Sequence, residues 1–220
     1  VGSYFQIDSY TGNGANRTLS FDSTLDTAPG FMVFHDRTTA SKEKLAYHES
    51  LGNGKHLQCE ANAAAGTNAT FLNNTSPTTT TFRLGTMDNV NADTKTYIMY
   101  AWANSGPYFF GEMVGNNNAD GPVISVGGSP ASTIIKRSSA TENWLLLNAL
   151  EPGYNLVDNV NYLNLTNAMA VNHGTTRIDI LSNGVKVRGT NTNINNGTYI
   201  YGAFGIQPMT DGSVNQGRAR

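Results

Sequence analysis

Apolar and polar residues alternate over short stretches along most of the chain. The clearest stretch is 96–103, in which Tyr97 and Met99 alternate with Ile98 and Tyr100. A period of two puts the two sets on opposite faces of one strand, so one face is expected to be buried. On the same grounds, strands are predicted at 5–10, 17–21, 30–36, 45–50, 56–60, 79–84, 96–103, 109–114, 122–126, 132–137, 144–148, 154–157, 176–182, 185–188 and 198–206.

Turn residues separate these stretches at short intervals. The turn pairs are Asn13-Gly14, Asn53-Gly54, Gly127-Gly128, Asn183-Gly184 and Asn196-Gly197. Many short strands with regular turns predict an all-β fold of the β-sandwich or jelly-roll type. One short helical turn is expected around 62–65 and another around 165–170, and neither is long enough to be stable alone.

A similar series of landmarks occurs twice along the chain, with an offset of about 100 residues, the size of one small β domain. The matching pairs are Tyr4-Phe5 with Tyr108-Phe109, 13–16 with 117–120, 31–37 with 132–137, 89–91 with 193–195, and 97–102 with 199–204. Apolar strands and turn residues repeat, whereas most charged residues do not. We therefore expect two tandem β-sandwich repeats, at 1–103 and 108–207, followed by a C-terminal tail at 208–220.

The composition argues against several classes of protein. Only 14% of the 220 residues are charged and the formal net charge is −2, so no basic stripe can neutralise the phosphates of a nucleic acid. No apolar run approaches the roughly 20 residues that span a bilayer, so no membrane insertion is expected. The first residues lack the features of a signal peptide, which predicts, for a complete chain, a protein that is not exported by the ordinary route. Cys59 is the sole cysteine, so no disulfide can form within the chain.

One loop has the oxygen-rich spacing of a calcium site. Asp88, Asn89, Asn91 and Asp93 offer alternating oxygen ligands, as at the start of a calcium-binding loop. Thr94 stands where such a loop has glycine, and no glutamate follows at the usual place. These four residues are therefore a candidate calcium site, with a polar turn as the alternative, and no other metal or cofactor is expected.

No catalytic residue stands out. His56 and Cys59 are three apart on a predicted strand, so their side chains point to opposite faces, and we expect a buried cysteine rather than a thiolate nucleophile or zinc ligand. A glycosidase needs two carboxylates across a cleft, and no spacing singles out a pair. The available carboxylates are Asp36, Glu43, Glu49, Glu60, Glu112, Glu142 and Glu151. The chain has no nucleophile-elbow serine, phosphate-binding glycine loop or zinc-protease motif.

Several aromatic residues are candidates for binding. Flat apolar ring faces can stack on the C–H surface of a sugar or contact a protein partner. The candidates are Tyr100, Trp102, Tyr108, Trp144 and Tyr154. The alternative is burial, because one face of the strand at 96–103 must pack in a core.

Several motifs together resemble a repeat found in structural proteins of marine bacteriophages. They are Tyr10-Thr11-Gly12-Asn13-Gly14 with Arg17, Ala28-Pro29-Gly30 before an apolar strand, Asn89-Val90-Asn91, and Thr96-Tyr97-Ile98-Met99-Tyr100-Ala101-Trp102. The second repeat departs from this pattern, since it has Ser129-Pro130-Ala131 in place of Ala-Pro-Gly. The resemblance spans almost the whole chain. It implies β-sandwiches like those of concanavalin or laminin-G domains, located on the particle surface or tail, and it supplies no catalytic residues.

These observations predict a non-enzymatic bacteriophage virion structural protein on the particle surface, either a tail or baseplate appendage or a capsid decoration protein. Its expected partners are other virion subunits. By analogy with phage surface proteins we expect a homo-oligomer, with a trimer favoured. One alternative is a host-receptor or glycan-binding lectin-like module of a tail fibre, and a second alternative is a polysaccharide depolymerase.

Overall fold

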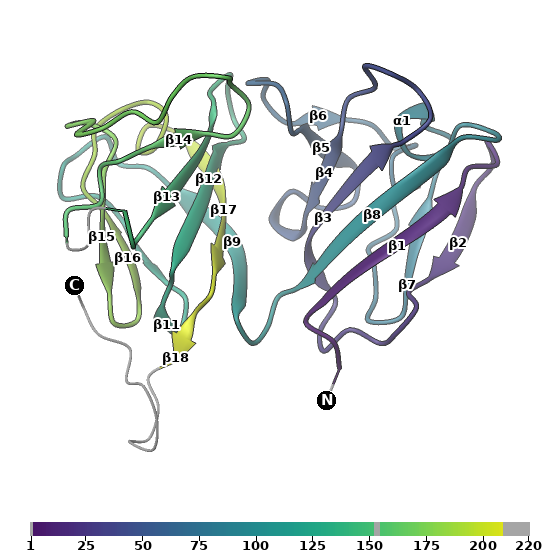
Figure 1. The fold of residues 1–220 in the computed structure, drawn as a ribbon, viewed down its shortest axis with the longest axis horizontal. Helices are drawn as coiled ribbons and strands as arrows, with labels where there is room; N and C mark the ends of the chain where they lie inside the picture. Colours follow the sequence, from purple (N-terminus) through teal and green to yellow (C-terminus); the bar gives the residue numbers. More distant parts are fainter. Residues whose placement is uncertain (1, 152–154, 209–220) are drawn as a thin grey trace. The chain divides into compact units, whose positions relative to one another are not determined.

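The chain is almost entirely β-structure, as the alternating pattern predicts (Figure 1). The computed structural model describes residues 2–151 and 155–208. It divides into two compact units, unit 1 (Val1–Gly106) and unit 2 (Pro107–Arg220), and each is described by itself. The predicted all-β fold is therefore confirmed. The boundary between the units, after Gly106, falls between the segments 1–103 and 108–207 that the sequence predicts as separate repeats.

Unit 1 is a two-layer β-sandwich. Its strands are β1 (Phe5–Thr11), β2 (Arg17–Ser20), β3 (Pro29–Asp36), β4 (Leu45–His48), β5 (Lys55–Gln58), β6 (Gly66–Thr67), β7 (Thr81–Leu84) and β8 (Thr96–Ala103). A six-stranded sheet has the order β1-β8-β3-β4-β5-β6, and β2 pairs with β7 in a second sheet. Phe34 and Met99 from the large sheet share one buried core with Phe82 and Leu84 from β7.

Strand β8 shows how the sequence pattern produces this sandwich. Tyr97, Met99 and Ala101 are each 0% exposed, whereas the residues between them are partly exposed. Burial of the alternate side chains removes apolar surface from water, which is the main favourable term in folding. The predicted two-faced strand at 96–103 is therefore confirmed.

Unit 2 is built in a similar way. Its strands are β9 (Tyr108–Val114), β10 (Val123–Ser125), β11 (Gly128–Ser129), β12 (Ser132–Arg137), β13 (Trp144–Asn148), β14 (Asn161–Tyr162), β15 (Ile178–Leu181), β16 (Gly184–Val187), β17 (Thr198–Phe204) and β18 (Gln207–Pro208). The largest sheet has the order β14-β13-β12-β17-β9, and β10-β16-β15 form another. Ile135 and Leu145 from the first sheet share a core with Val185 and Val187 from the second.

A buried asparagine joins three backbone segments in unit 1. Asn91 is 0% exposed and ends the short helix α1 (Asp88–Asn91). Its Nδ2 donates to the carbonyls of Ala15 at 2.7 Å and Gly85 at 2.8 Å, and its Oδ1 accepts from the amide of Asn13 at 3.1 Å. One side chain thus pairs backbone groups that would otherwise lack a partner away from water.

A buried tyrosine completes this network. The Tyr97 hydroxyl accepts from the amide of Ala92 at 2.9 Å and donates to the carbonyl of Asp88 at 2.6 Å. It thereby closes both ends of α1, a helix of a single turn that could not form alone.

The same network occurs in unit 2. Asn195 is 0% exposed, and its Nδ2 donates to the carbonyls of Asn118 at 2.7 Å and Gly189 at 2.8 Å. Its Oδ1 accepts from the amide of Asn116 at 2.9 Å. The Tyr199 hydroxyl accepts from the amide of Asn196 and donates to the carbonyl of Thr192. We call the two copies the Asn–Tyr networks.

The hydrogen bonds correct one matching pair from the sequence. Asn91 and Asn195 are counterparts, as the pairing of 89–91 with 193–195 predicts. However, the amide of Asn13 donates to Asn91, and the amide of Asn116 donates to Asn195 in the same way. The counterpart of Asn13 in unit 2 is therefore Asn116 and not Asn117. The sequence comparison missed this shift because both positions are asparagines in a run of three.

The short helices are elsewhere than predicted. Segments 62–65 and 165–170 are irregular, and the described helical turns are α1 and the 3-10 turn η1 (Glu49–Leu51). An alanine-rich segment of four residues gains too few hydrogen bonds to form a helix, whereas α1 is held by the Asn–Tyr network.

The C-terminal prediction is partly corrected. Pro208, predicted to begin the tail, pairs with Gly128 as part of β18. The remaining tail residues, 209–220, lie outside the described residues, as does the start of the predicted strand at 154–157.

Removal of the central amide should destabilise its own unit strongly. We expect Asn91→Ala to lower the free energy of unfolding of unit 1 by about 3–4 kcal/mol, because three backbone groups lose their partner at once. Asn195→Ala should have the same effect on unit 2.

Urea unfolding followed by circular dichroism measures the free energy of unfolding of both variants. Asn89→Ala, which removes a single side-chain hydrogen bond to Glu43, is the control and should cost less than about 1 kcal/mol. Equal losses for the Asn89 and Asn91 variants would contradict this role.

Candidate functional site

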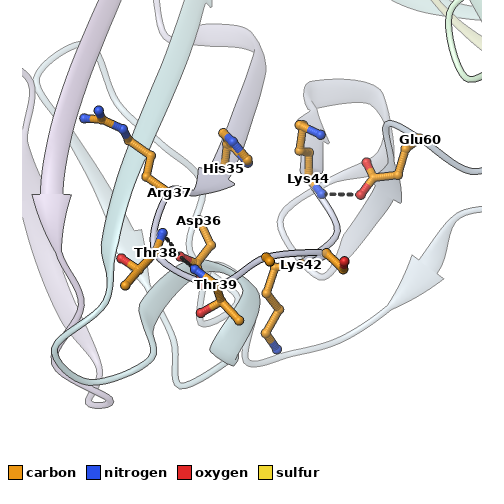
Figure 2. Close-up of a pocket in the computed structure, with 10 residues that line it drawn as sticks. His35, Asp36, Arg37, Thr38, Thr39, Lys42, Lys44 and Glu60 are labelled. Carbon is orange, nitrogen blue, oxygen red and sulfur yellow. Dashed lines mark hydrogen bonds between the residues drawn. The ribbon is translucent and has the colours of Figure 1, made fainter.

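The most distinctive surface feature of unit 1 is a polar hollow of about 630 Å³ where β3 ends (Figure 2). It is lined by His35 and Asp36 from β3, by residues 37–42 of the loop that leads to β4, and by Lys44 and Glu60. We call it the β3 hollow. It is open to solvent and large enough for one or two sugar rings.

Asp36 is fixed at the base of the β3 hollow. Its Oδ1 accepts from the amides of Thr38 at 2.7 Å and Thr39 at 3.0 Å. Burial acts to raise the pKa of Asp36, but these hydrogen bonds and the nearby Lys95 outweigh it, so the pKa is lowered. Asp36 is therefore an ionised acceptor at neutral pH and is unsuited to act as a general acid.

The basic side chains line the rim of the hollow instead of converging on one point. In Figure 2 the guanidinium of Arg37 points away from Asp36, and Lys42 and Lys44 extend in different directions. The amide of Lys44 donates to Glu60 Oε1 at 2.8 Å. Charges spread in this way suit an extended ligand that carries hydroxyl groups and more than one charge.

Arg37 also lines a second, smaller hollow of about 360 Å³, together with residues of β1 and β8. The amide of Arg37 donates to the carbonyl of Thr96 at 2.8 Å, and the hydroxyls of Thr38 and Thr96 lie 2.8 Å apart. These bonds tie the loop after β3 to the start of β8. The two hollows therefore share a wall that is held by the central strands of the sheet.

The Asn–Tyr network also helps to position the β3 hollow. Asn89, on α1, donates to Glu43 Oε2 at 2.8 Å. Glu43 lies between Lys42 and Lys44, which both line the hollow. The order of this loop thus depends partly on α1.

The fold brings two of the candidate glycosidase carboxylates, Asp36 and Glu60, to the same hollow. A glycosidase acid needs a raised pKa, and the pKa of Asp36 is lowered. Asp36 is also only 2% exposed. Asp36 is therefore not suited to be the acid of such a pair.

Within each unit the described candidate aromatic residues pack against other rings or are buried. Trp102 lies among other rings of unit 1, with centroid distances of 5.0 Å to Phe5, 5.6 Å to Phe31 and 6.2 Å to Tyr100. In unit 2, the ring centroids of Tyr108 and Phe204 lie 5.8 Å apart, and the side chain of Trp144 is only 4% exposed. Tyr154 lies outside the described residues.

Two of the four candidate calcium residues, Asn89 and Asn91, use their side chains for other contacts. Asn91 uses both amide atoms in the Asn–Tyr network, and Asn89 donates to Glu43. No group of three or more His, Cys, Asp or Glu side chains among the described residues is arranged to hold a metal ion. The polar-turn interpretation of 88–93 is therefore the better one.

The sequence contained an unused signal for the β3 hollow. In a chain with few charges, Asp36, Arg37, Lys42, Glu43 and Lys44 crowd into nine positions. Such a run is usually a solvated face, and its neighbour Glu60 is distant in sequence. Only the pairing of β4 with β5 brings Glu60 to Lys44.

The thiol of Cys59 should react slowly. Burial, with a contribution from Glu60, raises its pKa to about 12, so the thiolate fraction at pH 8 is on the order of 10⁻⁴. We expect the native protein to react with an aromatic disulfide reagent at least about 100-fold more slowly than the urea-unfolded chain. Equal rates in the two states would show an accessible thiolate and would reopen a nucleophilic role.

Comparison with known proteins gives one match. No curated protein and no solved structure matches the chain. No described helix has the length and apolar character needed to cross a membrane. Residues 2–208 match the family described as a domain of unknown function, DUF7483. Since this match spans nearly the whole sequence, the chain belongs to the DUF7483 family.

Proposed function

We propose that this chain is a non-enzymatic structural protein on the surface of a bacteriophage particle, as a tail or baseplate appendage or as a capsid decoration protein. Its two units are tandem β-sandwich modules. The chain assembles with copies of itself, as a trimer, and with other virion subunits. The motifs at 10–17, 28–33, 89–91 and 96–102, which resemble marine phage structural proteins, support the phage origin.

One observation carries the structural role: both units have the Asn–Tyr network, but their charged residues differ. Asp36 stands opposite Tyr97, and Arg137 stands opposite Tyr199 at the same place in unit 2. Arg137 lies 3.8 Å from Glu142 in an ion pair. A reaction requires particular charged side chains, whereas a scaffold requires strands and turns. The shared elements here are those of a scaffold.

Sheet edges offer surfaces for assembly. β1 and β9 are the end strands of their sheets, and Ile7 on β1 and Val114 on β9 are 51% and 65% exposed. An edge strand can pair with a strand of another subunit, and an exposed apolar side chain adds buried area when it does. Assembly through these strands needs no catalytic group.

Antibody labelling of intact particles tests this proposal. We expect gold-labelled antibody against this protein to decorate purified particles of the phage that encodes it, and the position of the label separates head from tail. Sedimentation of the isolated protein should give the mass of a trimer. Absence of the protein from purified particles, checked by mass spectrometry, would refute a virion role.

A second candidate function is glycan binding, and the β3 hollow favours it. The hollow is lined by the exposed carboxylate of Glu60, by hydroxyl groups and by lysines, which can bind sugar hydroxyls and acidic sugar substituents. A tail-fibre module that binds host glycans would use such a site.

Glycan binding predicts a defined pattern of variants. On a glycan array, Lys42→Ala/Lys44→Ala should weaken binding by about tenfold or more, because two charge-assisted contacts are lost. Lys55→Ala, an exposed lysine on β5 outside the hollow, should have no effect. Loss of binding in Trp102→Ala alone would move the site to the aromatic residues. Release of reducing ends from host polysaccharide would instead indicate a depolymerase.

A further inference from the structure

A carboxylate is buried on the core side of edge strand β1. Asp8 lies opposite Met99, a core residue of β8, and is only 8% exposed. Neither of its carboxylate oxygens has a well-formed hydrogen bond within the described part of the chain, and its polar neighbour is Asp22 on the loop after β2. A buried carboxylate without a partner is costly, so its presence requires an explanation.

The loop after β2 brings a second carboxylate to Asp8. Gln6 lies two residues before Asp8 on the same face of β1, and its side chain hydrogen-bonds to Ser23 in this loop. Gln6 Oε1 accepts from the Ser23 amide at 3.2 Å, and Gln6 Nε2 donates to Ser23 Oγ at 3.0 Å and to the Ser23 carbonyl. Asp22 is the preceding residue, and its carboxyl lies within hydrogen-bonding reach of Asp8. The loop held at Ser23 thus brings Asp22 close to Asp8 at the edge of the sandwich.

The sandwich scaffold does not require these acids. In unit 1, Asp8 lies opposite Met99, which lies opposite Phe34 on its other side. In unit 2, Gly111 lies opposite Tyr201, which lies opposite Ile135 on its other side. Gly111 is therefore the counterpart of Asp8. A Cβ atom on Gly111 would lie 2.5 Å from the Tyr201 hydroxyl, so this space is filled by the tyrosine.

The second acid is also absent from unit 2. In unit 1 the amide of Phe21, just after β2, donates to the carbonyl of Thr80, just before β7. In unit 2 the amide of Val126, just after β10, donates to the carbonyl of Asn183, just before β16. Gly127 is therefore the counterpart of Asp22. The paired carboxylates of unit 1 are an addition to the scaffold, and they add electrostatic cost where unit 2 has none.

No basic side chain compensates this charge. Within residues 2–151 and 155–208, the ion pairs involve Asp120, Glu142 and Asp179, and none reaches Asp8 or Asp22. Tyr10, next on the same face of β1, and Tyr97 beside it on β8 have raised pKa values because both are buried, so they stay neutral. Among the described residues no charged partner is left for the pair, so a proton or a bound cation must neutralise it.

Either species can occupy the site, depending on pH. Burial and the adjacent Asp22 raise the pKa of Asp8 from 3.8 to about 6. Below that pH a proton on Asp8 removes its charge. Above it Asp8 is ionised beside Asp22, and carboxylate oxygens are the ligands that hard divalent cations such as calcium prefer.

We propose that Asp8 and Asp22 bind a divalent cation of the calcium class at the edge of unit 1, linking the loop after β2 to β1. Asp22 is exposed, so water completes the coordination. A site with two carboxylates is a weak one, with a Kd on the order of 10⁻⁴–10⁻³ M.

Calcium titration of the full chain tests the site. After chelator treatment, isothermal titration with CaCl₂ at pH 7.5 should give a Kd in this range, and about 10 mM calcium should raise the Tm by several degrees. At pH 5 the affinity should be about tenfold lower, because a proton on Asp8 competes with the cation.

Asp8→Asn and Asp22→Asn should both abolish the calcium response. The new amide in Asp8→Asn can donate to Asp22, so this variant should remain folded. Because the pKa of Asp8 is raised on folding, the calcium-free wild type loses stability as pH rises from about 4 to about 6, and Asp8→Asn should not. Its calcium-free Tm at pH 7.5 should therefore equal or exceed that of the wild type.

Asp26→Asn, at an exposed position a few residues along the same loop, is the matched control and should bind calcium normally. Either of two results would overturn the proposal. One is no calcium response of the wild type up to about 10 mM, a concentration well above the expected Kd. The other is an unchanged affinity in both the Asp8 and the Asp22 variants.

Discussion

The structure of each unit depends on one buried amide. Asn91 and Asn195 each pair three backbone groups from segments that are distant in sequence, and a tyrosine hydroxyl closes the adjoining turn. Buried backbone groups without partners are strongly unfavourable, so this side chain allows an irregular crossing of three segments inside a β-sandwich. Strand pairing accounts for the sheets, and the Asn–Tyr network helps to hold the segment through which the chain returns from one sheet to the other.

This constraint reaches the polar surface of unit 1. The network stabilises α1, and Asn89 on α1 donates a hydrogen bond to Glu43. The loop that contains Glu43 forms one wall of the β3 hollow. Bonds from Arg37 and Thr38 to Thr96 hold the other side of that loop. A polar hollow between strands needs such supports, because its lining residues contribute little buried apolar surface.

The same scaffold carries different chemistry in its two copies. Unit 1 has Asp8, Asp22 and Asp36 where unit 2 has Gly111, Gly127 and Arg137. The shared parts are backbone contacts and core residues, whereas the variable parts are charged side chains at the end or edge of a strand. A proposed role in assembly or display is compatible with this division, since the scaffold keeps its shape while the surface changes.

Alternation with a period of two determined the all-β class and predicted that one face of the strand at 96–103 is buried, and the structure shows that this is the face with Tyr97, Met99 and Ala101. This succeeded because side-chain direction along a strand follows directly from sequence position. The recurrence of Asn-x-Asn before each tyrosine strand also indicated that Asn91 and Asn195 are counterparts. Sequence could not show that Asn91 is a buried structural amide instead of a calcium ligand, because the same residue type serves both roles and only its hydrogen-bond partners distinguish them. Nor could it bring Glu60 to Lys44 or Asp22 to Asp8. Those contacts are set by strand register and by a loop held at Ser23, which depend on packing between residues far apart in the chain.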